Sequence, residues 1–330
     1  MKKVILHIGR HKSGTSSLQQ FLVHNESALA KRGYSYPTAL RRPIAHHLLA
    51  RHYHPKMNEP LSQEVLQDFW TEVDAAENII ISSEAFQNID PKKMQKDFEN
   101  YDLEIVVYIR EQIGYFLSAY SQAIKARKVT WTMHEYEEKV FNATYINFLK
   151  RWEEAFPNAK LNVRVFSKKS LINGDIIEDF LVSSGICTLD EIKSFTPFED
   201  DKNPSIGGSL LEFKRLLNFT DYETKVKKGK LYRVLRQMTL KHQQYKLDKS
   251  LPEDLYQKMY KKYSETNTKI SKKYLKDALI LEENVQFVEE YRMSEKELHQ
   301  IFDDMHSEDK KMAKILKTAY FTFIMEKSVL

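Results

Sequence analysis

The first 200 residues alternate short apolar runs with segments whose apolar residues recur at helical spacing. Apolar runs typical of buried strands occur at Val4–Ile8, Asn78–Ser83, Glu104–Ile109 and Leu161–Phe166. Helical periodicity covers Leu18–Arg32, Leu61–Ala76, Ile113–Ile124 and Met133–Phe156. This alternation predicts an α/β fold, with a mostly parallel central sheet and helices on both of its faces. In such a sheet, ligands bind at the carboxyl ends of the strands.

From Asn203 onward the pattern is almost entirely helical. We expect helices at Leu210–Asn218, Lys230–Tyr245, Pro252–Asp277, Val285–Tyr291 and Ser294–Met325. The change in pattern predicts two parts: an α/β core of residues 1–202 and a helical C-terminal region of residues 203–330 that packs on the core.

Composition narrows the class of protein. With 330 residues, of which 42% are apolar, the chain can bury a substantial core. Its single cysteine, Cys187, excludes an internal disulfide framework and fits a reducing compartment, so we expect a cytoplasmic protein. The first apolar run stops at Gly9, too soon for a secretory signal, and no window approaches the roughly 20 apolar residues of a membrane span.

The chain is basic overall, and one stretch of it is strongly basic. The formal net charge of +5 indicates anionic ligands, and the stretch Lys214–Lys246 carries ten Lys or Arg residues against two acids, Asp221 and Glu223. Such a stretch is most often a solvated helix face. The alternative is a contact surface for an anionic acceptor, such as an acidic polysaccharide or a phosphorylated lipid head group at a membrane surface. No nucleic-acid-binding motif accompanies the charge, so we expect no nucleic-acid partner.

The first strand runs into a turn rich in Gly, Ser, Thr and Lys, and then into a helix. The first N–H groups of a helix lack acceptors within it and favour a phosphate or sulfate. Gly14 allows close approach of the backbone, Lys12 adds positive charge, and the neighbouring hydroxyls add donors. We therefore expect an anion site made of Arg10, His11, Lys12, Ser13, Gly14, Thr15, Ser16 and Ser17. The alternative is a solvated polar loop.

This loop differs from the loop that binds nucleoside triphosphates. That motif reads G-x-x-x-x-G-K-[ST], with its lysine directly after the second glycine. Gly9 and Gly14 keep the spacing, but Thr15 stands in the lysine position and Lys12 lies two residues ahead of Gly14. A second segment has a related pattern, because the strand Glu104–Ile109 ends on Arg110 and leads into an amphipathic helix that carries Ser118.

The K-S-G-T-S loop and the Arg110–Ser118 spacing resemble those of sulfotransferases that use 3′-phosphoadenosine 5′-phosphosulfate (PAPS) and release 3′,5′-bisphosphoadenosine (PAP). Four sequence motifs are similar to those of a bacterial, carbohydrate-type branch of this family. They are H-I-G-x-H-K-S-G-T-S-S-L-Q at 7–19, S-S-E at 82–84, N-x-S at 203–205 and E-T-N-T-K-I-S-K-K-Y at 265–274. The resemblance covers roughly residues 1–275. There is no R-K-G motif near the C-terminus, and residues 280–330 have no counterpart.

The resemblance implies a P-loop-type three-layer fold and no metal ion. It implies that the N-terminal loop holds the 5′-phosphate and that Arg110 and Ser118 bind the 3′-phosphate. The acceptor would be a hydroxyl of a carbohydrate or glycolipid, with the C-terminal region as a candidate for binding it. Lys12 would stabilise charge on the bridging oxygen as the phosphate leaves.

An acceptor hydroxyl needs a base to take its proton. Glu84 is one candidate, because it follows a strand at the place where family members have a histidine or glutamate base. The other candidate is the run that contains His46 and His47, since histidine titrates nearest to neutral pH. Two further functions stay open: a P-loop kinase acting on a nucleotide or small molecule, and a non-catalytic anion-binding scaffold.

Overall fold

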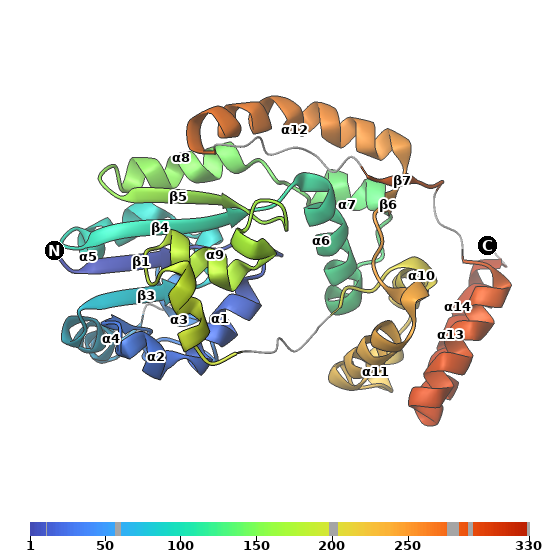
Figure 1. Ribbon diagram of the computed structural model, residues 1–330. Helices are drawn as coiled ribbons and strands as arrows, with labels where there is room; N and C mark the ends of the chain where they lie inside the picture. Colours follow the sequence, from blue (N-terminus) through green and yellow to red (C-terminus); the bar gives the residue numbers. More distant parts are fainter. Residues whose placement is uncertain (11, 57–60, 198–203, 276–283, 290–292, 329–330) are drawn as a thin grey trace. The chain divides into compact units, whose positions relative to one another are not determined.

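The computed structural model describes residues 1–10, 12–56, 61–197, 204–275, 284–289 and 293–328 (Figure 1). The chain divides into two compact units. The first comprises Met1–Glu111, Thr144–Asp200 and Tyr263–Ile280, and the second comprises Gln112–Ala143, Asp201–Lys262 and Leu281–Leu330.

A five-stranded parallel sheet forms the centre of the first unit. Its strands are β1 (Lys3–His7), β2 (Tyr34–Ser35), β3 (Asn78–Ser82), β4 (Asp102–Ile109) and β5 (Lys160–Val165), and their order across the sheet is β2-β3-β1-β4-β5. The central strand is β1, because Lys3 is opposite Asn78 of β3 on one side and Asp102 of β4 on the other. The carboxyl ends of β1, β3 and β4 therefore lie next to one another.

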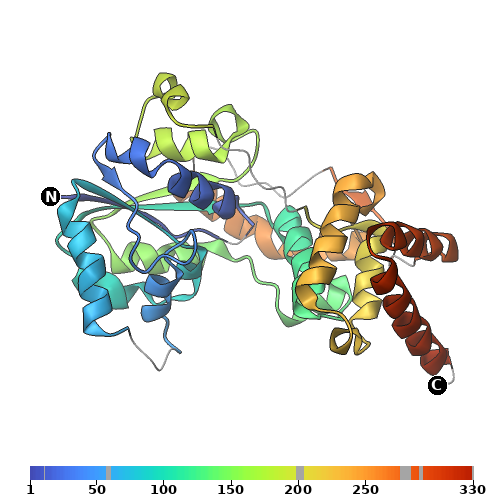
Figure 2. The same ribbon diagram turned by 90° about the horizontal axis from the view of Figure 1, so that it is seen from below.

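Helices cover both faces of this sheet. They are α1 (Thr15–His24), α2 (Glu26–Ala30), α3 (His47–His52), α4 (Gln63–Ala75), α5 (Gln95–Phe98), α8 (Tyr145–Ala155) and α9 (Ile176–Ser183). Figures 1 and 2 show α1, α2 and α9 on one face and α4, α5 and α8 on the other. Between the sheet and α1 and α9 lies a buried cluster that includes Ile5, Leu18, Tyr108 and Phe180. The prediction of an α/β fold with a parallel sheet is confirmed.

Three expected helices are interrupted. The expected helix Ser294–Met325 breaks at Asp309, whose backbone is extended (φ −157°, ψ 96°), into Glu295–Glu308 and Lys310–Ser328. The expected helix Leu18–Arg32 breaks at Asn25, whose Oδ1 accepts a hydrogen bond from the Thr196 N–H at 2.8 Å while its Nδ2 donates to the Thr196 carbonyl at 3.2 Å. The expected helix Met133–Phe156 is α7 (Met133–Lys139) followed by α8, with residues 140–144 between them. Apolar periodicity continued through all three breaks, so it did not reveal them.

The second unit is mainly helical, as expected for the C-terminal region. It contains α6 (Gln112–Arg127), α7, α10 (Gly208–Leu217), α11 (Lys228–Lys241), α13 (Glu295–Glu308) and α14 (Lys310–Ser328), while α12 (Glu253–Tyr274) runs from the second unit into the first. The prediction of a helix at Val285–Tyr291 was wrong. Gln286–Phe287 forms strand β7, parallel to β6 (Ser250–Leu251): the Gln286 N–H donates to the Lys249 carbonyl at 2.9 Å, and the Val288 N–H donates to the Leu251 carbonyl at 3.2 Å.

The division into units differs from the expected boundary at residue 202, since α6 and α7 group with the later helices. The cause lies in α10 and the residue after it. Asn218 donates from Nδ2 to the Ile124 carbonyl at 3.0 Å and to the Val129 carbonyl at 2.7 Å. Lys214 adds a bond to the Ile124 carbonyl at 3.2 Å. These bonds satisfy carbonyls at the end of α6 and join it to α10.

The described residues lack two features. No helix among them combines the length and the apolar character needed to span a membrane. Within the same residues, no group of three or more His, Cys, Asp or Glu side chains is placed to hold a metal ion.

Candidate functional site

The loop between β1 and α1 starts at the carboxyl end of the central strand. Its backbone has positive φ at Gly9 (+52°), Lys12 (+67°) and Gly14 (+74°). A Cβ at Gly9 would lie 2.8 Å from the Glu84 Cα, and one at Gly14 would lie 2.7 Å from the Phe166 ring. Both positions therefore require glycine, and the loop is tightly packed between the residues that follow β3 and those that follow β5.

The start of α1 is suited to an anion. Gly14 is the N-cap and supplies no side-chain bond to the first turn, which contains no acidic residue. The Ser13 hydroxyl is buried and donates to the Arg10 carbonyl at 2.6 Å, so it stabilises the loop. Thr15 is buried, Ser17 is half-buried and Ser16 is exposed. The first N–H groups of α1 and the Ser16 hydroxyl thus remain as the donors best placed for a ligand.

His11, the remaining residue of the expected anion site, lies outside the described residues. Arg10 is half-buried, and its guanidinium lies over two rings of α8, 5.0 Å from the centroid of Tyr145 and 5.3 Å from that of Phe148. These cation–π contacts fix the direction of the Arg10 side chain.

Arg110 directly follows β4, the neighbour of β1. Its Nη1 donates to the Lys12 carbonyl at 3.4 Å, so the guanidinium lies beside the anion-binding loop. The Tyr145 hydroxyl donates to the Arg110 carbonyl at 2.6 Å and holds the residue after the strand in place. Ser118, the expected partner of Arg110, is buried in α6 and belongs to the second unit. The pairing of Arg110 with Ser118 stays a prediction.

Glu84 is the first residue of a 3₁₀ helix, Glu84–Asn88, that follows β3. Its Oε1 lies 3.9 Å from Nε2 of His47, and its Oε2 accepts a hydrogen bond from Nε2 of Gln19 at 3.1 Å. The His47 Nδ1 lies 2.8 Å from the Ser83 hydroxyl. The side chains of Glu84 and His47 are 18% and 39% exposed, so both candidate bases reach solvent side by side.

A buried network of hydrogen bonds holds the Glu84 carboxylate in place. Besides its bond to Glu84, Gln19 donates to the Ser82 hydroxyl at 3.2 Å, and that hydroxyl lies 2.8 Å from Nδ1 of His7. Burial lowers the pKa of His7 to about 4, against an opposing effect of Glu84, so the ring is neutral near pH 7. Gln19 was not predicted as a site residue. The sequence carried one sign of its role: Gln19 is a polar residue on the apolar face of the helix that became α1.

His46 does not join this pair. It is fully buried; its Nδ1 accepts from the Ser82 N–H at 3.2 Å, which leaves Nε2 to donate to the Pro37 carbonyl at 3.0 Å. Burial lowers its pKa to about 4. Both ring nitrogens are therefore used within the fold, and the geometry favours Glu84 and His47 over His46 as candidate bases.

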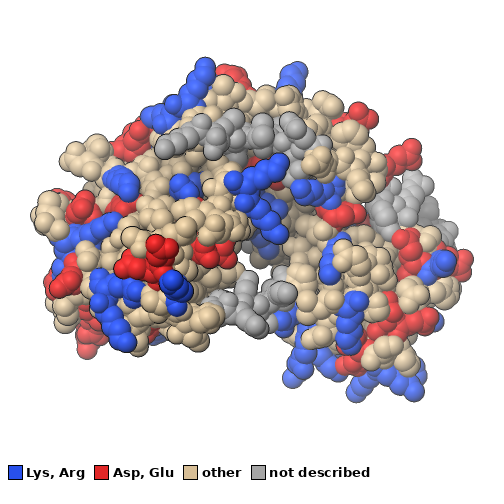
Figure 3. All heavy atoms as spheres, in the orientation of Figure 1, with Lys and Arg blue, Asp and Glu red and all other residues tan. Residues whose placement is uncertain are grey.

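The basic stretch Lys214–Lys246 is partly neutralised within the second unit. Figure 3 shows Lys and Arg side chains over α11 at the lower edge of the second unit, with acidic side chains nearby. Arg215 pairs with Glu212, Lys230 with Asp309, and Lys241 with Glu308, whereas Lys214 is buried. These pairs account for three of the ten basic residues, and Lys225, Lys227 and Lys228 are exposed, so a solvated helix face and a contact surface for an anionic acceptor both stay open.

Comparison with known proteins gives little about activity. No family model matches the chain. The chain is 32% identical over 142 residues to an uncharacterized protein of Archaeoglobus fulgidus. The match covers 42% of this chain and 38% of that protein, so the chain spans well under half of its relative's length.

Proposed function

We propose that this chain is a PAPS-dependent sulfotransferase with a P-loop-type core, which transfers a sulfuryl group to a hydroxyl of a carbohydrate or glycolipid. One observation carries the proposal. The Gly9–Gly14 loop leaves the central strand between β3, which is followed by Glu84, and β4, which is followed by Arg110. An anion-binding turn, a candidate base and a fixed cation thus lie at one edge of one sheet.

In this proposal each group has a separate task. The N–H groups at the start of α1 and the hydroxyls of the loop hold the 5′-phosphate of the donor. Arg110 binds the 3′-phosphate, a task for which its planar guanidinium is suited. Lys12 stabilises the negative charge that develops on the bridging oxygen.

The base completes the reaction. Glu84, held by Gln19, takes the proton of the acceptor hydroxyl. The acceptor oxygen then forms a bond to sulfur while the bond between sulfur and the bridging oxygen breaks, and its electron pair leaves with PAP. The His47 ring lies 3.9 Å from the Glu84 carboxylate and is 39% exposed, so in this proposal a water molecule carries the proton from Glu84 to His47, which releases it to solvent.

The test is calorimetry on the purified chain with PAP, adenosine 5′-phosphate, and ATP with Mg²⁺. We expect PAP to bind without a metal ion and more tightly than adenosine 5′-phosphate. Incubation with radiolabelled PAPS and a panel of saccharides should then give labelled product. Lys31→Ala, which changes an exposed lysine of the same unit outside the site, serves as a control and should behave as the parent chain.

Two outcomes would overturn the proposal in different ways. Tight binding of ATP with Mg²⁺, together with no binding of PAP, would favour a P-loop kinase. Binding of PAP without transfer to any acceptor in a broad panel would favour a non-catalytic anion-binding scaffold.

A further inference from the structure

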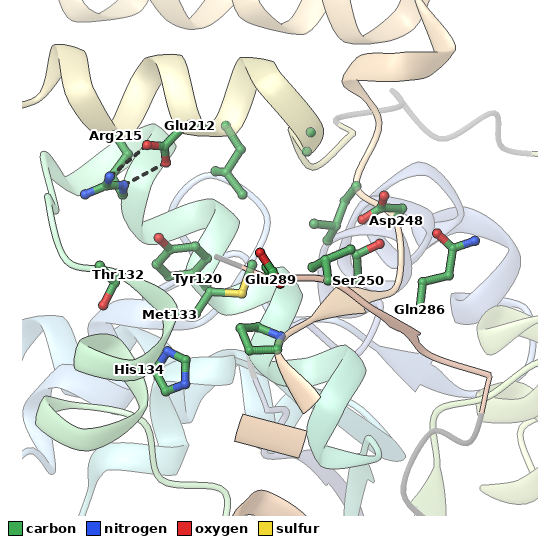
Figure 4. Close-up of a pocket in the computed structure, with 16 residues that line it drawn as sticks. Tyr120, Thr132, Met133, His134, Glu212, Arg215, Asp248, Ser250, Gln286 and Glu289 are labelled. Carbon is green, nitrogen blue, oxygen red and sulfur yellow. Dashed lines mark hydrogen bonds and ion pairs between the residues drawn. The ribbon is translucent and has the colours of Figure 1, made fainter. Parts of the chain in front are cut away.

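The second unit contains a cavity of about 370 Å³ that includes none of the residues discussed above as donor-binding or catalytic (Figure 4). This volume lies within the usual range of small-molecule sites. Six apolar or aromatic residues form much of its wall: Tyr120, Met133, Leu211, Leu247, Pro252 and Val288. A ligand in this cavity would therefore bury an apolar body.

Close backbone contacts shape the cavity. A Cβ at Gly207 would lie 2.5 Å from the Leu247 Cα, so glycine is needed where the start of α10 approaches the segment before β6. The parallel pairing of β6 with β7 places Ser250 opposite Gln286. Alternate residues of the two strands line the cavity, whereas Leu251, between Ser250 and Pro252, does not line it and is fully buried. The wall is thus fixed by main-chain pairing and is largely preformed.

Three charged or titratable side chains of the wall, Glu212, Arg215 and His134, already have ion-pair partners. Glu212 and Arg215 form two bonds of 2.8 Å, drawn as dashed lines in Figure 4, and Arg215 also donates to the Thr130 carbonyl. His134 pairs at 2.9 Å with Asp254, which lies outside this cavity. Neither pair is available as a free charge for a ligand.

Two further carboxylates have no such partner. Asp248 and Glu289 line the cavity, and neither forms an ion pair with another residue in the described part of the chain. A second cavity of about 680 Å³ shares Glu289 and His134 with the first and adds Glu253 and Asp254. The surroundings of the cavity are therefore acidic, although the chain as a whole carries a net charge of +5.

We infer that this cavity is a binding site for an organic cation that consists of an ammonium group on an apolar body. The apolar wall buries the body, and the carboxylates of Asp248 and Glu289 attract the ammonium group. The same carboxylates repel anions, so this ligand is of the opposite charge class to a phosphorylated donor. The inference does not depend on the proposed sulfuryl transfer.

The experiment compares three probes that share one apolar body, a phenyl ring with four methylenes: 4-phenylbutylamine, 4-phenylbutanol and 5-phenylpentanoate. Calorimetry with the full chain at low salt should show the amine binding about five- to tenfold more tightly than the alcohol, as expected for partly exposed ion pairs. The carboxylate should bind more weakly than the alcohol. The preference for the amine should shrink at high salt, because these carboxylates are exposed.

Variants assign the preference to the two carboxylates. The double variant Asp248→Asn/Glu289→Gln keeps the shape of the wall, and we expect it to bind the amine and the alcohol equally. The control Asp303→Asn changes an exposed carboxylate of α13 outside both cavities and should keep the parent preference. Val288→Trp should fill the cavity and weaken the binding of all three probes.

Three results would overturn the inference. They are equal binding of the amine and the alcohol by the parent chain, tighter binding of the carboxylate than of the amine, and no binding of any probe at millimolar concentration. An amine preference that survives in the double variant would also contradict it, since the charge would then lie elsewhere.

Discussion

Gln19 and Glu84 are joined by a hydrogen bond of 3.1 Å between Nε2 and Oε2, although they lie 65 residues apart in the chain. Gln19 is almost completely buried on α1, the helix that starts at the anion-binding loop. The bond therefore fixes the direction of the carboxylate relative to the loop. A buried donor that also bonds to Ser82 has little freedom to turn away.

Removing this donor should affect turnover more than binding. In Gln19→Leu we expect turnover to fall by about tenfold while the affinity for PAP stays within twofold, because Gln19 contacts the carboxylate and not the loop. Ser82→Ala removes the other partner of Gln19 and leaves Glu84 held, so it should have a smaller effect. Steady-state kinetics and calorimetry check both variants. Unchanged turnover in Gln19→Leu would contradict a positioning role.

Replacement of the candidate base should abolish chemistry without disturbing the donor site. For Glu84→Gln we expect turnover to fall by about 10²- to 10⁴-fold, the usual contribution of a general base, with PAP affinity retained. His47→Asn should cost less, since in the proposal it only receives the proton from Glu84. Near-normal turnover of Glu84→Gln with loss of turnover in His47→Asn would make His47 the base.

The loop lysine should matter for transfer and not for folding. Lys12→Ala leaves a Cβ at a position with φ of +67°, so the backbone strain there does not change. We expect sulfuryl transfer to become undetectable while thermal unfolding occurs within a few degrees of the parent chain. Transfer at the parent rate would mean that the loop has been misassigned.

Loss of the strand-end guanidinium should remove selectivity for the 3′-phosphate. In Arg110→Ala, PAP and adenosine 5′-phosphate should bind with similar affinity, a loss for PAP of about 1.5–3 kcal/mol for charge-assisted bonds. Arg51→Ala, an exposed arginine on α3, is the matched control. Selectivity that persists in Arg110→Ala would assign the 3′-phosphate to another residue.

A buried lysine gives the second unit a pH-dependent stability. Lys214 is 1% exposed, and burial lowers its pKa from 10.5 to about 7, with Glu223 opposing the shift and Lys228 and Lys128 adding to it. Between pH 7 and 10.5 the unfolded chain binds a proton that the folded chain does not. This group therefore makes the free energy of unfolding rise with pH in that window, by at most about 1.4 kcal/mol per pH unit.

Lys214→Met removes this titration. The variant should gain stability relative to the parent chain below pH 7, and the difference should shrink as the pH rises toward 10. Lys314→Met, at an exposed position of α14, should show no such trend. Urea unfolding at a series of pH values measures both. A difference between Lys214→Met and the parent chain that does not vary with pH would contradict the assignment.

The sequence predicted the parts of the fold that depend on local pattern. Four continuous apolar runs became β1, β3, β4 and β5 within a few residues of the expected bounds. The carboxyl-end rule then brought the β1–α1 loop, Glu84 and Arg110 to one edge of the sheet. These features follow from runs and turns that lie close together in the chain.

Features that depend on distant contacts were missed. The break at Asn25 depends on Thr196, and the strand at Gln286–Phe287 depends on β6. Likewise, α6 belongs to the second unit because Asn218 bonds to the carbonyls at and beyond its end. His46 is unsuited as a base because its ring nitrogens bond to Ser82 and Pro37, which lie 36 and 9 residues from it in the chain. In each case a side chain or main-chain group finds a partner that no local pattern reveals.

The position of β1 has a consequence for synthesis of the protein. This strand is synthesised before β3 and β4, yet it pairs with β3 on one side and β4 on the other. The turn after it can therefore reach its final shape only when the chain has grown past Ile109, the last residue of β4. Nascent chains shorter than this expose the bare edge of an apolar strand, which is a place where chaperones or self-association can act.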